Sequence, residues 1–318
     1  MDKSIVLVCG SGELGSRYLQ GIKHHELPLR IFVYDPSKNS LDLSKTRWDE
    51  VKCNENLHSI SFHKSLEGIK GIINLCIVST TANVRLKVVN DVSKLLKVEN
   101  WILEKVLAQR VDDLDSILVS IGANSKAWVN TSRRIMPWHQ AIKDELDHKS
   151  KFHFSVSGSH WGLACNAIHF LDLFCWWSKQ SLENIDTGDL SNNWIESKRK
   201  NFWEIEGTLK AKFSGNATAS LTATKNDMPV RIKIVNKKEW EINESDGLAM
   251  RSDGLTIRGA IDYQSTLTPL LIKSILTNGC CNLPSLEESV SMHKVLIKNL
   301  HAHWNEYGNA NIAYLPIT

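Results

Sequence analysis

The 318-residue sequence lacks the marks of several protein classes. No hydrophobic run is long enough to span a bilayer, and the apolar stretch at residues 5–8 is too short for a signal-peptide core. Basic residues form only short runs and the formal net charge is +3, so a nucleic-acid groove is not expected. These absences predict a cytoplasmic protein without membrane or nucleic-acid partners.

The sequence is also poor in metal-binding and disulfide patterns. It contains seven cysteines, an odd number, and no C-x-x-C pair, which is typical of reduced thiols. The histidine pairs lack partners at ligand spacing, so we expect no metal site. There is no internal repeat and no low-complexity linker. The 42% hydrophobic content is that of an ordinary globular protein.

Short apolar strands alternate with helical stretches in the first part of the chain. Such alternation predicts βαβ units and a parallel sheet. Strands are expected at residues 4–9, 30–34, 59–62, 72–78, 101–103 and 127–130, and helices at 13–24, 83–96 and 111–121. The sequence therefore predicts a doubly wound α/β sheet of the Rossmann type over residues 1–128.

The pattern changes near residue 130. Apolar and polar residues alternate over 203–213, 217–224, 230–235 and 239–242, which indicates a mostly antiparallel sheet with one wetter face. Helices are expected at 138–146, 163–177 and 286–304, and a strand at 152–156. Because the chain exceeds what one hydrophobic core usually serves, we expect a second domain over residues 129–318, an α+β unit for substrate binding and oligomerisation.

A glycine motif follows the first expected strand and opens the first helix. It reads G-x-G-x-x-G and consists of Gly10, Ser11, Gly12, Glu13, Leu14 and Gly15. In a dinucleotide site the first glycine permits a tight turn, the second lets the backbone approach the pyrophosphate, and the third lets the helix pack closely on the sheet. The helix N-terminus then offers N–H groups to the phosphates.

Asp35 ends the second expected strand, twenty positions after the last glycine of the motif. An acid there accepts hydrogen bonds from the adenosine ribose and repels the 2′-phosphate of NADP, so NAD is favoured and NADP stays the alternative. Ser79 and Thr80, after the strand 72–78, and Glu104, after the strand 101–103, are assigned to the same cofactor site. Ligands of open α/β sheets collect at these carboxyl ends.

Several segments resemble one enzyme family. The pair Glu104–Lys105 is similar to the E-K-P signature of the glucose–fructose oxidoreductase / inositol dehydrogenase family (Gfo/Idh/MocA). Residues 130–137 resemble its strand-to-helix segment with Arg and Pro. Residues 162–173 resemble its substrate helix, and residues 283–289 its late L-P-x-x-E-E-S stretch. The matches run in the family's order over nearly the whole chain.

The resemblance implies that Lys105 and His169 are catalytic and face the substrate carbon beside the nicotinamide. Substrate contacts are predicted for Arg134, Trp161 and Asn166. The alternatives to such contacts are a salt bridge for Arg134 and core packing for Trp161. For His169, the alternative is a buried core histidine.

Two positions depart from the family pattern. The proline after Glu-Lys is Val106 here, and the aspartate four residues before the catalytic histidine is Cys165. The family's Lys–Asp–His trio is therefore incomplete, which leaves open whether the site is active.

The resemblance implies an NAD(P)-dependent oxidoreductase that acts on a secondary hydroxyl or ketone of a sugar, sugar derivative or nucleotide sugar. One hypothesis places this reaction in the biosynthesis of surface saccharides. A homo-oligomer, dimer or tetramer, is also implied. Two alternatives stay open: a dinucleotide-binding protein with a regulatory or scaffold role, and an epimerase assisted by NAD.

Overall fold

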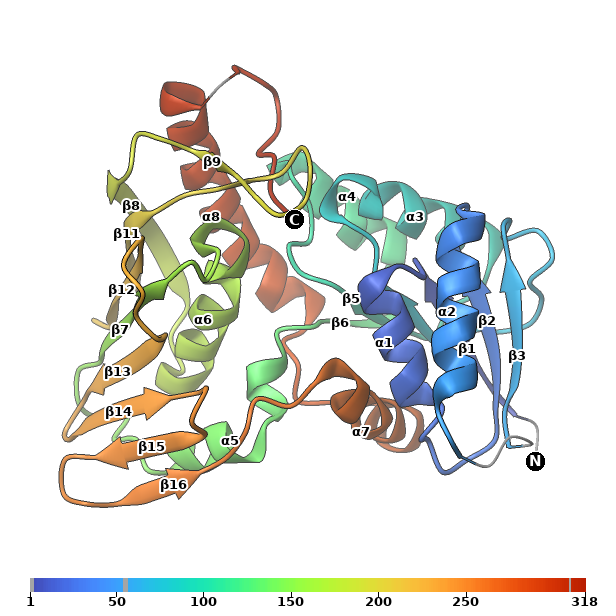
Figure 1. Ribbon diagram of the computed structural model, residues 1–318, viewed down its shortest axis with the longest axis horizontal. Coiled ribbons are helices and arrows are strands. Elements are labelled where there is room, and N and C mark those ends of the chain that lie inside the picture. Colours follow the sequence, from blue (N-terminus) through green and yellow to red (C-terminus); the bar gives the residue numbers. More distant parts are fainter. Residues whose placement is uncertain (1–2, 54–56, 309) are drawn as a thin grey trace. The chain divides into compact units, whose positions relative to one another are not determined.

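The computed structural model describes residues 3–53, 57–308 and 310–318. The chain forms two compact units, each built from separate segments (Figure 1). The first unit comprises Met1–Leu107, Asp115–Asn130 and Asp262–Leu286, and the second comprises Ala108–Leu114, Thr131–Ile261 and Glu287–Thr318. Within the described ranges, no helix has the length and the hydropathy that a membrane span requires.

A six-stranded parallel sheet forms the centre of the first unit, in the order β3-β2-β1-β4-β5-β6. The strands are β1 (Ser4–Cys9), β2 (Leu29–Tyr34), β3 (Ser59–His63), β4 (Leu75–Val78), β5 (Asn100–Leu103) and β6 (Lys126–Val129). The strand order reverses at β1, which pairs with both β2 and β4. In open α/β sheets, ligands bind at the carboxyl ends of the strands beside such a reversal. The predicted doubly wound parallel sheet is confirmed.

Helices flank this sheet, and two of them were missed by the sequence reading. They are α1 (Glu13–Ile22), α2 (Lys38–Glu50), α3 (Ala82–Leu95), α4 (Val111–Ile121) and α7 (Gln264–Asn278). The missed α2 is mostly polar and buries only Leu41, Ser44 and Trp48, so its apolar period is weak.

The other missed helix, α7, changes the domain division. It packs against α1 so closely that a Cβ on Gly21 would lie 2.6 Å from the carbonyl oxygen of Ser265. The segment Asp262–Leu286 therefore belongs to the first unit, whereas the sequence placed it in the domain 129–318. The first crossing into the second unit follows Leu107, and the main one follows Asn130, two residues after the predicted boundary.

An eight-stranded sheet dominates the second unit, in the order β16-β15-β14-β13-β7-β12-β11-β8. Its strands are β7 (His153–Ser159), β8 (Leu182–Leu190), β11 (Gly207–Phe213), β12 (Thr218–Thr224), β13 (Arg231–Val235), β14 (Glu239–Asn243), β15 (Leu248–Arg251) and β16 (Thr256–Arg258). Neighbouring strands are antiparallel except β7 and β12, which run parallel. The predicted mostly antiparallel sheet is thus confirmed, although β8, β15 and β16 were not foreseen.

The remaining elements of the second unit include a short two-stranded ribbon and the helices beside the large sheet. They are η1 (Ser132–Ile135), α5 (Pro137–Asp144), α6 (Leu163–Ser178), β9 (Ile195–Glu196), β10 (Trp203–Glu204) and α8 (Leu286–Tyr307). The ring of Phe174 on α6 stacks on Phe154 of β7, with centroids 4.4 Å apart. This contact places the apolar helix α6 against the inner face of the sheet.

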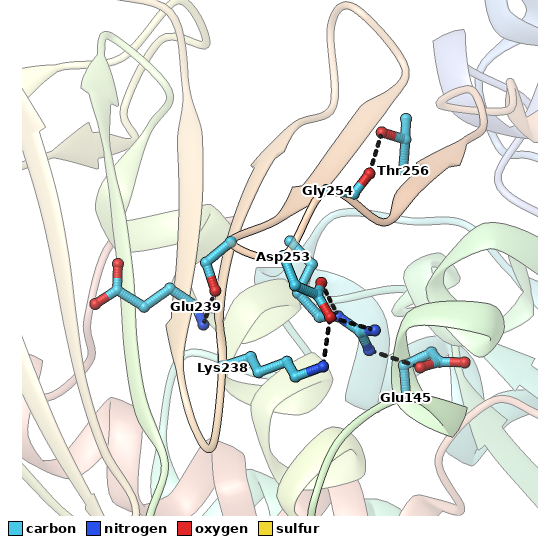
Figure 2. Close-up of polar contacts among 8 residues, drawn as sticks. Glu145, Lys238, Glu239, Asp253, Gly254 and Thr256 are labelled. Atoms are coloured by element: carbon cyan, nitrogen blue, oxygen red, sulfur yellow. Dashed lines mark hydrogen bonds and ion pairs between the residues drawn. The ribbon is translucent and has the colours of Figure 1, made fainter.

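The two faces of the large sheet differ as the alternation predicted. In β11, Leu209 and Phe213 are buried, while Lys210 and Lys212 between them are exposed. At the edge of the sheet, Asp253 accepts a bond from Lys238 (Figure 2) and another from Arg251, whose guanidinium also donates to Glu145 at 2.6 Å. These contacts join the turn between β15 and β16 to Lys238, just before β14, and to Glu145 at the end of α5.

Candidate functional site

The glycine motif folds into a tight loop between β1 and α1. Gly10 has a φ of +88°, a left-handed conformation that favours glycine, and its N–H donates to the Tyr34 carbonyl at 2.8 Å. A Cβ on Gly15 would lie 1.9 Å from the Gly10 carbonyl oxygen, so only glycine fits there. The loop therefore has the turn and the close helix approach that the motif predicted.

Gly12, the N-cap of α1, differs from its neighbours because a Cβ built there would meet no atom within 4 Å. Open space next to a helix N-terminus lets a phosphate approach the backbone N–H groups. Among the described residues, the buried hydroxyls of Ser11 and Thr80 have no hydrogen-bond partner. A buried hydroxyl normally has a partner, so these groups fit a polar ligand bound at the loop.

Asp35 follows β2 directly and lies beside the loop. One of its carboxylate oxygens accepts the Ser11 N–H at 2.8 Å, and the other accepts the Ser37 N–H at 2.8 Å. These bonds orient the carboxylate at the end of β2, where a ribose is held in dinucleotide sites. The Ser79 hydroxyl donates to the Gly10 carbonyl at 2.7 Å and so supports the loop from β4.

The other residues assigned to the cofactor site lie at the start of α1 and after β5. Glu13 is exposed and forms an ion pair with Arg47 at 2.8 Å, and Leu14 is half-buried. Glu104 is buried, 4% exposed, and its carboxylate accepts bonds from the Tyr18 hydroxyl and the Asn130 amide. Contacts of these three residues with a cofactor stay predictions.

Burial shifts the titration of this polar cluster. It raises the pKa of Glu104, an effect that hydrogen bonds from Tyr18 and Asn130 and the charge of Arg85 oppose. Burial also raises the pKa of Tyr18, and the nearby Glu104 carboxylate adds to the rise. Lys105 comes next in the chain and is half-buried. The cluster thus fixes the end of β5, from which Lys105 projects.

The second unit contains a cavity of about 550 Å³ that holds three of the predicted residues. It is lined by Arg133, Ser159, Trp161, Asn166, His169, Phe170, Met228, Pro229, Val230, Glu244, Ser245 and Ile261. Its volume lies within the range of small-molecule sites, and it combines aromatic walls with a few polar groups, as such sites do. The sequence reading foresaw His169, Trp161 and Asn166 as site residues, and the structure brings these three together.

Two aromatic rings form one wall of this cavity, which we call the His169 cavity. Trp161 and Phe170 meet edge to face, with centroids 5.3 Å apart, and the Trp161 indole donates to the Thr222 carbonyl at 3.0 Å. The Asn166 amide donates to the Trp161 carbonyl at 2.6 Å. The indole is therefore held in place while it lines the cavity.

An ion pair between half-buried Arg133 and buried Glu244 forms another part of the His169 cavity, and the sequence did not predict it. The Arg133 guanidinium donates two bonds to the Glu244 carboxylate, at 2.8 and 2.7 Å. It also lies over the Phe170 ring, 4.2 Å from the centroid. His139, fully buried, contacts the same carboxylate at 3.0 Å.

The charge of this pair is internally balanced. Burial raises the pKa of Glu244, but the Arg133 cation and the His139 hydrogen bond outweigh it and leave the pKa well below the ordinary value. Burial lowers the pKa of His139, so this ring stays neutral near pH 7. One cation and one anion thus face the cavity together.

Arg134 does not line the His169 cavity. Its guanidinium donates two bonds to Asp172, at 2.9 and 2.6 Å, and both side chains are buried. The Thr131 hydroxyl donates to the same carboxylate at 2.7 Å. Burial raises the pKa of Asp172 to about 6, against the opposing effect of Arg134. Of the two roles open from the sequence, the structure shows the salt bridge, and the substrate contact stays a prediction.

Cys165 occupies the position of the missing aspartate on α6. Its thiol contacts the Gly162 carbonyl oxygen at 3.6 Å. A thiol is a weak donor and does not replace a carboxylate as a charged partner. Lys105 belongs to the first unit and His169 to the second, so each is placed here within its own unit.

Among solved structures, several oxidoreductases share this architecture. An oxidoreductase from Agrobacterium radiobacter, in complex with NAD+, L-tartaric acid and magnesium, is 14% identical, with coverage of 96% of this chain and 97% of that one and a TM-score of 0.71. Scyllo-inositol dehydrogenase from Lactobacillus casei, with NAD(H) and scyllo-inositol, is 14% identical, with coverage of 96% and 98% and a TM-score of 0.68. The chain has the fold of these oxidoreductases.

A third similar structure is UDP-N-acetylglucosamine 3-dehydrogenase from Acidithiobacillus ferrooxidans, at 12% identity, with coverage of 95% and 97% and a TM-score of 0.67. No protein-family model and no curated protein matches the sequence. The resemblance predicted from the sequence is confirmed at the level of the fold.

Proposed function

We propose that the protein is an NAD-dependent oxidoreductase that transfers hydride between the nicotinamide and a secondary hydroxyl or ketone of a sugar-type substrate. The observation that carries the proposal is the open backbone at Gly12, beside a loop that only glycine can form at Gly15. The shared fold supports the proposal, since two of the similar structures contain NAD+ or NAD(H).

The residues of the loop fit this cofactor. The N–H groups at the start of α1 would hold the pyrophosphate, and Asp35 would hold the ribose hydroxyls. The carboxylate of Asp35 would repel a 2′-phosphate, which favours NAD over NADP. When bound, the nicotinamide ring supplies the hydride acceptor or donor.

Lys105 and His169 would handle the proton of the reacting hydroxyl. A histidine has an ordinary pKa close to the working pH and so suits general acid–base catalysis. The Lys105 ammonium is a donor that would stabilise negative charge developing on the substrate oxygen. With Cys165 in place of the aspartate, we propose that Lys105 and His169 carry the proton transfer in place of the full Lys–Asp–His trio.

The His169 cavity supports an uncharged sugar or polyol as the substrate. Trp161 and Phe170 offer apolar ring faces, and Ser159 and Ser245 offer hydroxyl groups. The Arg133 cation is already matched by Glu244, so little net attraction remains for a substrate carboxylate or phosphate. The balanced charge of the cavity therefore favours free sugars over nucleotide sugars.

One set of measurements tests the proposal. Cofactor binding is measured by quenching of tryptophan fluorescence with NAD and with NADP. Turnover is then followed through the absorbance of reduced nicotinamide with panels of neutral sugars, polyols, uronates and nucleotide sugars. We expect tight NAD binding and turnover of a neutral member. NAD binding without turnover of any member would favour the regulatory or scaffold role that Cys165 suggests, and cofactor that copurifies and never exchanges would favour an epimerase.

We also propose that the open face of the large sheet contacts a second copy of the chain. Small hydroxyl side chains line its centre, and Thr208 and Thr222 are hydrogen-bonded across β11 and β12 at 2.9 Å. Lys210 and Lys233 flank small hydroxyl side chains of this face in one cross-strand row, so a second copy would meet a stripe of small polar side chains between two lysines. Light scattering tests this: a mass equal to one chain at micromolar concentration would contradict it.

A further inference from the structure

Arg85, in the first turn of α3, is a buried cation bonded to main-chain carbonyls. Only 1% of the residue is exposed. One nitrogen of its guanidinium donates to the Val106 carbonyl and to the Leu107 carbonyl, the latter at 3.1 Å, and another donates to the Thr80 carbonyl. No carboxylate accepts any of these bonds. Burying a charge is costly unless it is well paired, so this arrangement calls for an explanation.

The charge of Arg85 persists in this environment. Burial lowers its pKa to about 10, and the Glu104 carboxylate acts in the opposite direction. A guanidinium with that pKa is still protonated at neutral pH. Its planar fork can donate in several fixed directions at once, which a lysine ammonium cannot do. Arg85 is thus suited to hold several carbonyls in one relative arrangement.

The three carbonyls belong to two loops of the proposed site. Thr80 follows β4 and is next to Ser79, whose hydroxyl supports Gly10 in the glycine loop. Val106 comes directly after Lys105. Arg85 therefore joins the loop beneath the cofactor-binding glycines to the loop that carries Lys105.

The sequence shows why such a connection is needed. Val106 stands where the resembled family has a proline, whose ring fixes its own φ. Valine imposes no such restriction on the backbone. Instead, the hydrogen bonds from the Arg85 guanidinium to the carbonyls of Val106 and Leu107 restrict the backbone at this point.

We propose that Arg85 is a positioning residue that holds Lys105 in place relative to the glycine loop and substitutes for the missing proline. The proposal rests on the proposed function, in which Lys105 acts on the substrate. Displacement of a catalytic group by about 1 Å can reduce turnover about 100-fold, so the effect of losing this constraint is measurable.

The test combines Arg85→Lys with Val106→Pro in a double-mutant cycle. Arg85→Lys keeps the charge but loses the fork, so we expect kcat to fall about 100-fold, with KM and NAD affinity changed less than about threefold. Val106→Pro alone should change kcat little, since both constraints are then present. In the double variant the proline should restore at least about tenfold of the lost kcat. Arg30→Lys, an exposed arginine of the same unit, is the matched control.

A second readout does not depend on activity. Hydrogen exchange of the peptide covering residues 104–108 should accelerate in Arg85→Lys and slow again in the double variant, while the glycine loop exchanges as in the wild type. If the wild type turns over no sugar, the proposed function fails, and the exchange data still decide the role of Arg85. Unchanged exchange at residues 104–108, or a kcat loss that Val106→Pro does not restore, would overturn the proposal.

Discussion

The glycine loop is formed mainly by main-chain groups, whereas the His169 cavity is formed by side chains. The loop is six consecutive residues whose main-chain groups form the site, and its fit depends on the absence of side chains at Gly12 and Gly15. The cavity is formed by side chains from residues 133 to 261 of the chain, including the ion pair of Arg133 and Glu244. A backbone site suits phosphate, a group common to all dinucleotides, whereas a site of side chains can distinguish one substrate from another.

We therefore expect cofactor binding and substrate choice to be separable in this protein. Changes in the loop should abolish cofactor binding whatever the substrate. Changes in the cavity should alter turnover or specificity and leave cofactor binding intact.

The largest effect is expected at Gly15. In Gly15→Ala the new methyl group would lie 1.9 Å from the Gly10 carbonyl oxygen, so the loop must deform, and NAD affinity should fall more than about 100-fold. Fluorescence titration measures it. Gly12→Ala is the matched comparison: it meets no neighbouring atom, so its Tm should be unchanged while NAD binds about tenfold more weakly. Wild-type NAD affinity in Gly15→Ala would show that cofactor binding does not depend on the close approach at Gly15.

The next effect is expected at His169. Replacement by glutamine removes a general acid–base group, and kcat should fall about 1000-fold while NAD affinity stays within about twofold. Steady-state kinetics and the same titration measure both quantities. His24→Gln, at an exposed histidine after α1, serves as the control. If His169→Gln weakened NAD binding and kcat alike, the two regions would not be separable.

Glu244 provides a test of specificity. In Glu244→Gln the Arg133 cation loses its charged partner, so a uronate should gain about tenfold in kcat/KM relative to the matching neutral sugar. Ser245→Ala, beside it in the same cavity wall, keeps the ion pair and should not shift this ratio toward the uronate. An unchanged ratio in Glu244→Gln would show that the ion pair does not set the charge preference.

The same residue predicts a pH dependence of stability. The pKa of Glu244 is lower in the folded protein than in the unfolded chain. The ionised carboxylate therefore stabilises the fold above the ordinary carboxyl pKa, and this stabilisation is lost as pH falls through the folded-state value. Neutral, buried His139 adds a loss of stability as pH falls below the ordinary histidine pKa. Denaturant unfolding of Glu244→Gln between pH 7 and pH 3 should show a shallower acid loss than the wild type. A steeper loss would contradict the assignment.

The smallest effect is expected at the cluster in Figure 2. Asp253 accepts bonds from Lys238 and Arg251, and these bonds lower its pKa, but the carboxylate lies at the surface and is screened by salt. Asp253→Asn should leave kcat and NAD affinity unchanged and shift Tm only slightly, less so at high salt. A large loss of Tm would show that this edge of the sheet stabilises the second unit more than its exposure suggests.

Sequence reasoning succeeded where the signal is local. The strand 4–9 and the helix 111–121 coincide with β1 and α4, because apolar period and flanking residues suffice to define them. It failed at α2, where three buried side chains give almost no period, and at α7, whose place in the first unit is decided by contact with α1.

The candidate site divides in the same way. His169, Trp161 and Asn166 come from one short segment, and the structure brings them together in one cavity. Arg133 and Arg134 are adjacent, and nothing in the sequence tells which of them faces that cavity. The choice depends on Glu244, 111 residues beyond Arg133, and on Asp172, 38 residues beyond Arg134.

The sequence by itself determined the parallel sheet, the glycine loop with Asp35 at its side, and the alternating strands of the second unit, because each depends on residues within one or two elements. Only the tertiary structure decided the neutral charge of the cavity, the salt bridge of Arg134 and the anchoring of the Lys105 loop by Arg85. Those features rest on side chains far apart in the chain, whose meeting is set by how helices and strands pack.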